Sequence, residues 1–136
     1  GVAMGNERID PSDYSAIAQL LARYCHIVDD KRWDSLLDVF ADDGSMTVTA
    51  LYDTHRGDAE LRVLYGETMN HPLAHHSTSV VVLEATEDTA RVVSKWVTVR
   101  DDGLTGTGVY ADDLVRTANG WRIAARVATP DKLRRS

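Results

Sequence analysis

Two adjacent carboxylates stand where a helix-forming segment should end, in the stretch RYCHIVDDKRW from Arg23 to Trp33. The carbonyl end of a helix carries partial negative charge, so Asp29 and Asp30 are disfavoured there by about 0.3–1 kcal/mol. Either they are solvated turn residues, or a partner offsets that cost. Asp29 is the better candidate for chemistry, because it lies at the edge of an apolar stripe while Asp30 falls toward solvent. Tyr24, on the same stripe, could donate a hydrogen bond to a ligand or simply pack in the core.

Three histidines follow in the middle of the chain, at positions 71, 75 and 76. Neighbouring residues on a strand point to opposite faces, so His75 and His76 make a poor metal pair. Pro72 prevents a helix that would bring His71 one turn away from His75. We therefore expect no metal site. Cys25, the single cysteine, fits no redox or zinc motif and is predicted to be a small buried residue.

The composition is that of an ordinary globular protein. The 136 residues are 43% apolar and 26% charged, with a formal net charge of −6, which predicts one domain spanning residues 1–136. No basic cluster is dense enough to follow a phosphate backbone and no apolar stretch could span a bilayer, so we expect neither nucleic acid nor membrane as a partner. The lone cysteine and the absence of a signal-peptide core predict a cytoplasmic protein. Residues 1–9 are expected to be flexible or partly a cloning scar before Met4, and residues 130–136 a C-terminal tail.

The first part of the chain is predicted to be helical. Asp10 can cap a helix that begins at Pro11, with Asp13 in its first turn. Apolar residues then recur at helical spacing: Ile17, Leu20, Leu21, Tyr24 and Val28. WDSLLDVF predicts a second, shorter helix ended by the turn ADDG, and DAELRVLYGETM predicts a third, weaker one.

The rest of the chain is predicted to be strands. SMTVTALYD indicates one strand, and THRG after it is predicted to be a turn that reverses the chain direction. After Pro72 come four strands: HSTSVVVLEAT, TARVVSKWVTVR, TGTGVYADDLVRT and WRIAARVAT. The turns ED, DDG and ANG join them into an antiparallel meander. Helices followed by such a meander define an α+β fold, and Gly106 and Gly108 suit a strand that bends sharply.

This arrangement resembles the SnoaL-like members of the nuclear transport factor 2-like superfamily, from about Ser12 to Thr129. Three segments carry the resemblance: LLARYCHIVDDKRWDSLLDVFADDGSM, HHSTSVVVLEATEDTARVVSKW and GVYADDLVRTANGWRIAAR. The resemblance implies a cone-shaped α+β barrel, with three N-terminal helices packed in a curved, mixed, mainly antiparallel sheet around an apolar pocket. The superfamily hosts dehydratases, isomerases, hydrolases and pure binding domains, so the fold alone does not give the function.

The resemblance also assigns candidate site residues. Asp29 falls on an aspartate at the end of the family's first helix, and His75 on a histidine that begins a middle strand. Ser79 stands where many members have asparagine, and Tyr24 matches a tyrosine that some dehydratases direct at the substrate. An aspartate beside a histidine holds the imidazole in one tautomer and raises its basicity. His75 would then act as general base and Tyr24 as hydrogen-bond donor; a structural role is the alternative for each.

Strand periodicity adds four candidate pocket residues. Trp96 and Thr98 share one face of their strand, and Tyr110 shares a face of the next strand with Asp112. Arg126, on the last strand, could bind a carboxylate, polarise a carbonyl or form an outward salt bridge.

The first functional hypothesis is a small cofactor-independent lyase of the dehydratase type, or an isomerase, acting on an apolar substrate of the polycyclic or polyketide kind. The second is a non-catalytic ligand-binding or dimerisation domain of the same fold. Epoxide hydrolysis is less favoured, because no arginine flanked by two aspartates is evident in the sequence. VVSKWVTV and VVVL carry apolar residues on both strand faces, which predicts a homodimer in which one face meets a second copy.

Overall fold

The structure, a computed structural model, describes residues 9–134. The prediction for the first nine residues therefore lies outside the described part of the chain, except at Ile9. The elements follow in this order: α1 (Pro11–Asp29), the 3₁₀ helix η2 (Trp33–Asp38), β1 (Phe40–Val48), β2 (Tyr52–Arg56), α2 (Gly57–Val63), the π-helical turn η3 (Leu64–Thr68), β3 (Ala74–Ala85), β4 (Thr89–Val99), β5 (Thr105–Thr117), β6 (Gly120–Pro130) and α3 (Asp131–Arg134).

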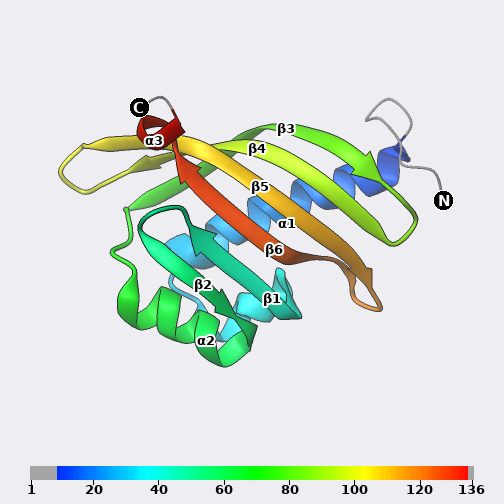
Figure 1. The fold of residues 1–136 in the computed structure, drawn as a ribbon, viewed down its shortest axis with the longest axis horizontal. Helices are drawn as coiled ribbons and strands as arrows, with labels where there is room; N and C mark the ends of the chain where they lie inside the picture. Colours follow the sequence, from blue (N-terminus) through cyan, green and yellow to red (C-terminus); the bar gives the residue numbers. More distant parts are fainter. Residues whose placement is uncertain (1–8, 135–136) are drawn as a thin grey trace.

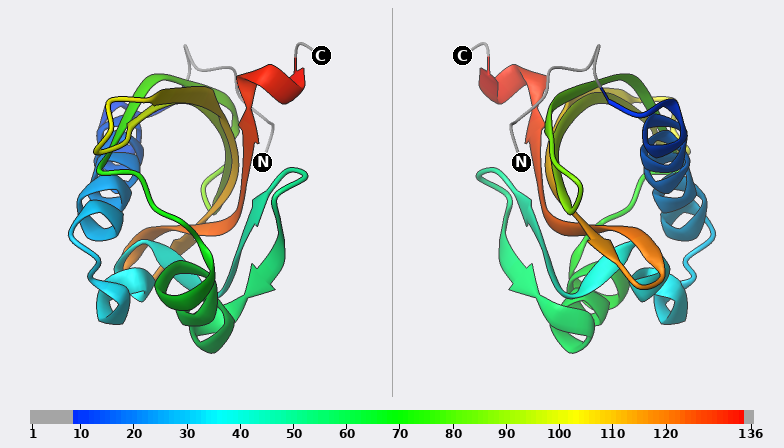
Figure 2. Two further views of the ribbon diagram at one scale, coloured as in Figure 1. Left: turned by 90° about the vertical axis from the view of Figure 1, so that its left-hand side faces the viewer. Right: turned by 90° about the vertical axis from the view of Figure 1, so that its right-hand side faces the viewer.

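The six strands of the described residues form one sheet in the order β2-β1-β6-β5-β4-β3 (Figure 1). Strands β3 to β6 form the predicted antiparallel meander, and β1 pairs in parallel with β6 and antiparallel with β2. The sheet curls over itself and α1 runs along its open side (Figure 2). The prediction of an α+β fold with a curved, mixed, mainly antiparallel sheet is confirmed.

Helix α1 forms as its sequence predicts. The Asp10 carboxylate accepts a hydrogen bond from the backbone N–H of Ser12 at 2.8 Å, and Pro11 occupies the first turn. Its apolar stripe is buried against the sheet, mainly on β3 and β6. The Asp13 carboxylate accepts hydrogen bonds from Arg116 on β5 (2.8 Å) and from the Trp121 indole on β6 (3.3 Å). These bonds connect the start of α1 to the hairpin between β5 and β6.

The prediction of three N-terminal helices is wrong, because within residues 9–134 only α1 is a long N-terminal helix. The segment WDSLLDVF gives a six-residue 3₁₀ helix, since its last residues enter the sheet instead: Ile123 donates its N–H to the carbonyl of Val39 at 2.8 Å. The third helix, α2, is seven residues long and follows β1 and β2 in the chain.

The first strand and its flanking turns also differ from the prediction. The sequence ADDG lies inside β1, where the register with β6 shifts between Phe40 and Ser45, so an irregularity absorbs these polar residues. The predicted single strand SMTVTALYD is divided by a turn at Ala50, which has a φ of 66°. His55, predicted in a turn, lies on β2. Among residues 9–134, no helix is long and apolar enough to cross a membrane.

Candidate functional site

The structure brings Asp29 and His75 together, although 46 residues separate them in sequence. Asp29 is the last residue of α1, and His75 is the second residue of β3. One carboxylate oxygen of Asp29 lies 2.6 Å from the imidazole Nδ1, and both oxygens lie 3.0 Å from the backbone nitrogen of His75. The contact holds the start of β3 against α1 and offsets the cost of an acid at a helix end.

This contact determines which imidazole nitrogen is available for chemistry. An ionised carboxylate can only accept hydrogen bonds, so Nδ1 carries the proton and Nε2 carries a free lone pair in the neutral ring. Burial lowers the pKa of His75, and the Asp29 carboxylate opposes that shift without cancelling it. His75 is therefore neutral at pH 7, with Nε2 unprotonated.

His75 lines an inner cavity of about 160 Å³. The wall is mainly apolar and aromatic, with contributions from Tyr24, Met46, Val48, Leu51, Tyr52, Met69, Trp96, Thr98, Tyr110, Ala128 and Pro130. An apolar cavity of about 150 Å³ is large enough for one benzene ring. The site is thus a ring-sized hollow with an imidazole in its wall.

Tyr24 also lines the cavity, and its hydroxyl lies 2.7 Å from that of Tyr65 on η3. Burial raises the pKa of both phenols, so both stay protonated. When Tyr65 donates to Tyr24, the proton of Tyr24 is free to bond to a ligand oxygen. Tyr65 is a site residue that the sequence analysis missed; its only sequence signal is an aromatic residue in the weak third helix.

Trp96, Thr98 and Tyr110 line the cavity, whereas Arg126 does not. Arg126 is fully buried behind the wall, where it donates two hydrogen bonds to Asp112, at 2.7 and 3.0 Å. Its guanidinium carbon lies 4.3 Å from the ring centroid of Tyr24 and 3.7 Å from that of Tyr110. Arg126 is therefore neither an outward salt bridge nor, in this arrangement, a ligand contact.

The pair of Arg126 and Asp112 supports the aromatic wall electrostatically. Burial alone would lower the pKa of Arg126, but the Asp112 carboxylate outweighs burial and raises it, so the guanidinium stays charged. A buried cation between two aromatic faces is stabilised by their quadrupoles. It holds Tyr24 and Tyr110 in fixed orientations beside the cavity.

The glycines of β5, which were predicted to suit a bend, also make room for neighbouring side chains. Gly108 pairs with Trp96 across the ladder, and a Cβ at Gly108 would collide with the indole carbons Cε2 and Cζ2. A Cβ at Gly106 would lie 2.9 Å from the hydroxyl of Thr98. The glycines thus leave room for the Trp96 ring to fold over β5 at the cavity wall.

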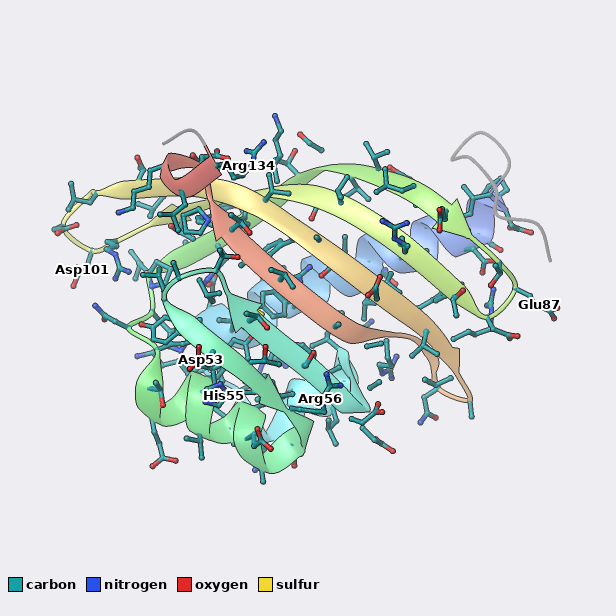
Figure 3. The ribbon with its side chains drawn as sticks, viewed as in Figure 1. Asp53, His55, Arg56, Glu87, Asp101 and Arg134 are labelled. Carbon is teal, nitrogen blue, oxygen red and sulfur yellow. The ribbon has the colours of Figure 1, made fainter. Side chains whose placement is uncertain are left out.

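The remaining candidates do not line the inner cavity. His71 stacks on Trp33 with a centroid distance of 5.1 Å, and its Nε2 contacts the carbonyl of Tyr65. His26 is exposed, and His55 bonds to the carbonyl of Asp53 on β2 (Figure 3). Cys25 is buried, as predicted. Within residues 9–134, no group of three His, Cys, Asp or Glu side chains could hold a metal ion.

The fold and cavity define a cone-shaped α+β protein with a one-ring pocket. The sequence profile of the SnoaL-like domain matches residues 11–127, so the chain belongs to the SnoaL-like family. This confirms the resemblance noted from the sequence. A search among curated proteins found no match.

Solved structures share the fold at low identity. A protein from Nostoc punctiforme PCC 73102 with a cystatin-like fold is 21% identical, with a TM-score of 0.80 over 90% of this chain and 94% of that chain. A candidate aromatic ring hydroxylase from Novosphingobium aromaticivorans is 27% identical, with a TM-score of 0.78 over 90% and 92%. A candidate scytalone dehydratase from the same species is 17% identical, with a TM-score of 0.74 over 88% and 84%. The likenesses at 21% and 17% identity establish the fold alone.

Proposed function

We propose that this protein is a small lyase of the dehydratase type or an isomerase, in which His75 is the general base. The observation that carries the proposal is the contact between Asp29 and the Nδ1 of His75, at the wall of an apolar cavity. A neutral imidazole with an unprotonated Nε2 is in the form that removes a proton near pH 7. The side chains at the site offer a base, a proton donor and a mainly apolar pocket, and the proposed reaction requires no cofactor.

In an elimination, Nε2 of His75 takes a proton from a substrate carbon, and the electrons of that C–H bond form a C=C bond. The departing oxygen leaves as the neighbouring C–O bond breaks, and it takes the proton of the Tyr24 hydroxyl. Tyr65, bonded to Tyr24 at 2.7 Å, stabilises the phenolate that forms. Asp29 stabilises the imidazolium. In an isomerisation, His75 returns the proton to a different carbon of the substrate.

The cavity favours a cyclic, apolar substrate. Its volume of about 160 Å³ accommodates one ring, so a polycyclic or polyketide-like substrate would place only one ring beside His75 and extend outward. An aromatic ligand also agrees with the name of the 27% identical relative, a candidate aromatic ring hydroxylase.

The test compares two active-site variants with matched neighbours. Activated alcohols and unsaturated ketones are screened first, and kcat/KM is then measured for any substrate found. Asp29→Asn and His75→Ala should each lower kcat/KM by about 10²- to 10⁴-fold, the usual contribution of general base catalysis. Asp30→Asn and His76→Ala are the controls, because both side chains are exposed beside the site, and each should stay within about twofold of wild type.

The proposal fails if His75→Ala retains wild-type activity, or if the exposed controls lose as much as the site variants. Absence of turnover, together with tight binding of small rings, would favour the second hypothesis, a ligand-binding domain.

A homodimer remains part of the proposal. Exposed apolar side chains on β3 and β6, Val81, Leu83 and Val127, support burial of this sheet surface against a second copy. Light scattering after size exclusion should give twice the mass of the chain at micromolar concentration. A monomeric mass would contradict this part of the proposal, and Val127→Asp should shift a dimer toward monomer.

A further inference from the structure

A second hollow adjoins the inner cavity and differs from it in charge. Its volume is about 440 Å³, and Trp96, Thr98 and Arg100 line both hollows. The outer hollow adds Lys132, from the short helix α3. Asp101 and Arg134, labelled in Figure 3, mark the two segments that supply these cations, at the same end of the sheet.

The two cations of the outer hollow have no carboxylate partner among the described residues. Arg100 is half-buried, and among the described residues its guanidinium makes one hydrogen bond, from Nη2 to the carbonyl of Asn70 at 3.3 Å. Neither Arg100 nor Lys132 belongs to any ion pair within residues 9–134. The lining of the outer hollow contains no aspartate or glutamate. This is a local positive site on a chain whose net charge is −6.

The nearest acids of the described chain form no ion pair with either cation. Asp131 precedes Lys132, but its carboxylate accepts a bond from Thr107 at 2.8 Å and pairs with Arg134. Asp101 and Asp102 follow Arg100 in the β4–β5 turn, but they line a different hollow with it, together with Asp29. The Asp102 carboxylate accepts a bond from the backbone N–H of Leu104 at 3.0 Å, which holds it in the turn. Most of the five guanidinium N–H donors of Arg100 therefore remain available.

We infer that the ligand of this protein is a ring carrying a carboxylate, with the ring in the inner cavity and the carboxylate on Arg100. The inference rests on the proposed function for the ring position and extends it to the substrate class. A planar guanidinium can bind both oxygens of a carboxylate, and a half-buried position strengthens that bond relative to a surface pair. Lys132, exposed at the rim, adds a second and weaker attraction.

The experiment uses a series of aromatic acids of increasing length and their neutral amides. The acids are benzoate, phenylacetate, 3-phenylpropanoate and 4-phenylbutanoate, and each is paired with the corresponding amide. Dissociation constants are measured by calorimetry on the full chain, at low and at high salt. The acid of best length should bind about five- to tenfold tighter than its amide, and salt should reduce the difference.

Single substitutions identify which side chain causes the preference for the acid over its amide. Arg100→Gln should bring the ratio of acid to amide affinity close to one, and Lys132→Gln should reduce it by about twofold. Arg91→Gln is the matched control, because Arg91 is an exposed arginine on β4, the strand that ends just before Arg100. Its partner is Glu84, and the substitution should leave the ratio unchanged. Equal binding of acid and amide at every length, an unchanged ratio in Arg100→Gln, or no binding by any member would overturn the inference.

His75→Ala separates this inference from the proposed function. Acid preference in both wild type and His75→Ala, with no turnover of any acid, would leave the carboxylate site standing and reject the catalytic proposal. Turnover of neutral substrates that depends on His75, with no preference for acids, would reject only the carboxylate site.

Discussion

Replacing Asp29 by asparagine changes the chemistry of His75 while preserving the size of the side chain. Asp29 accepts bonds from both the backbone nitrogen and the Nδ1 of His75. An asparagine oxygen can still accept the backbone N–H, but its amide group can also donate to Nδ1. A donor at Nδ1 favours the tautomer that carries its proton on Nε2, and in that tautomer Nε2 is no longer a base.

The structure sets the size of the two expected effects. Removal of the base from most molecules should lower kcat/KM by about 10²- to 10⁴-fold. The stability effect is smaller. A hydrogen bond to a charged group contributes about 1.5–3 kcal/mol, and the Asp29 side chain is 23% exposed, so we expect a loss of about 1–2 kcal/mol. The activity loss should therefore far exceed what partial unfolding could cause.

Nitrogen NMR of the imidazole ring tests this reasoning directly and needs no substrate. In wild type, long-range proton–nitrogen correlations should show His75 protonated at Nδ1 and unprotonated at Nε2. In Asp29→Asn the proton should move partly or wholly to Nε2, while Asp30→Asn should resemble wild type. Urea unfolding of the same samples supplies the stability change.

Two results would refute the argument. A wild-type His75 that carries its proton on Nε2 would show that the carboxylate does not select the tautomer. A tautomer that is unchanged in Asp29→Asn, combined with a large activity loss, would show that Asp29 acts by some other route.

Three further predictions follow from single contacts. Because burial lowers the pKa of His75 below its ordinary value of 6.5, the unfolded state binds more protons on acidification, so the stability that neutral His75 contributes is fully present above pH 6.5 and is lost as the pH falls through the folded-state pKa. The urea midpoints of wild type and His75→Gln should therefore converge as the pH falls, and a constant difference between them would contradict this. Gly108→Ala should lower the free energy of unfolding by about 1–3 kcal/mol because its methyl group meets the Trp96 ring, and Gly106→Ala should lower it less, since the Thr98 hydroxyl can rotate away. Equal losses in the two variants would exclude the collision with Trp96 as the cause. Asp10→Ala should cost about 0.5–2 kcal/mol by removing the cap of α1, seen as a lower thermal midpoint, and an unchanged midpoint would mean that the cap is dispensable.

Local sequence rules were most reliable where one physical cause dominates. The first helix combines a cap, a proline at its start and one apolar stripe, and it forms as predicted. The four later strands also form, because turn residues separate long β-branched runs. The second helix failed because eight residues cannot form a stable helix when their last residues pair with β6.

It was harder to predict which face of the sheet each side chain points to, because irregularities in the strands interrupt the alternation of side chains. The register of β3 shifts between Thr78 and Val81, around Ser79, which has a φ of 57°. Each bulge moves the residues after it to the opposite face, so periodicity alone cannot say which side chains reach the cavity. The sequence also left open whether the Arg126 side chain points inward or outward, because an arginine between small apolar residues fits either face of the strand until its partner is known.

The sequence by itself determined the first helix, the four later strands, the family and the candidates Asp29, His75 and Tyr24, since these follow from local spacing and from a pattern shared along the chain. Only the tertiary structure decided their partners. The carboxylate of Asp29 meets an imidazole 46 residues away, Tyr24 meets Tyr65 across 41 residues, and Arg126 turns inward to Asp112. Such contacts depend on how the sheet curls around α1, and no local preference of the backbone encodes that curl.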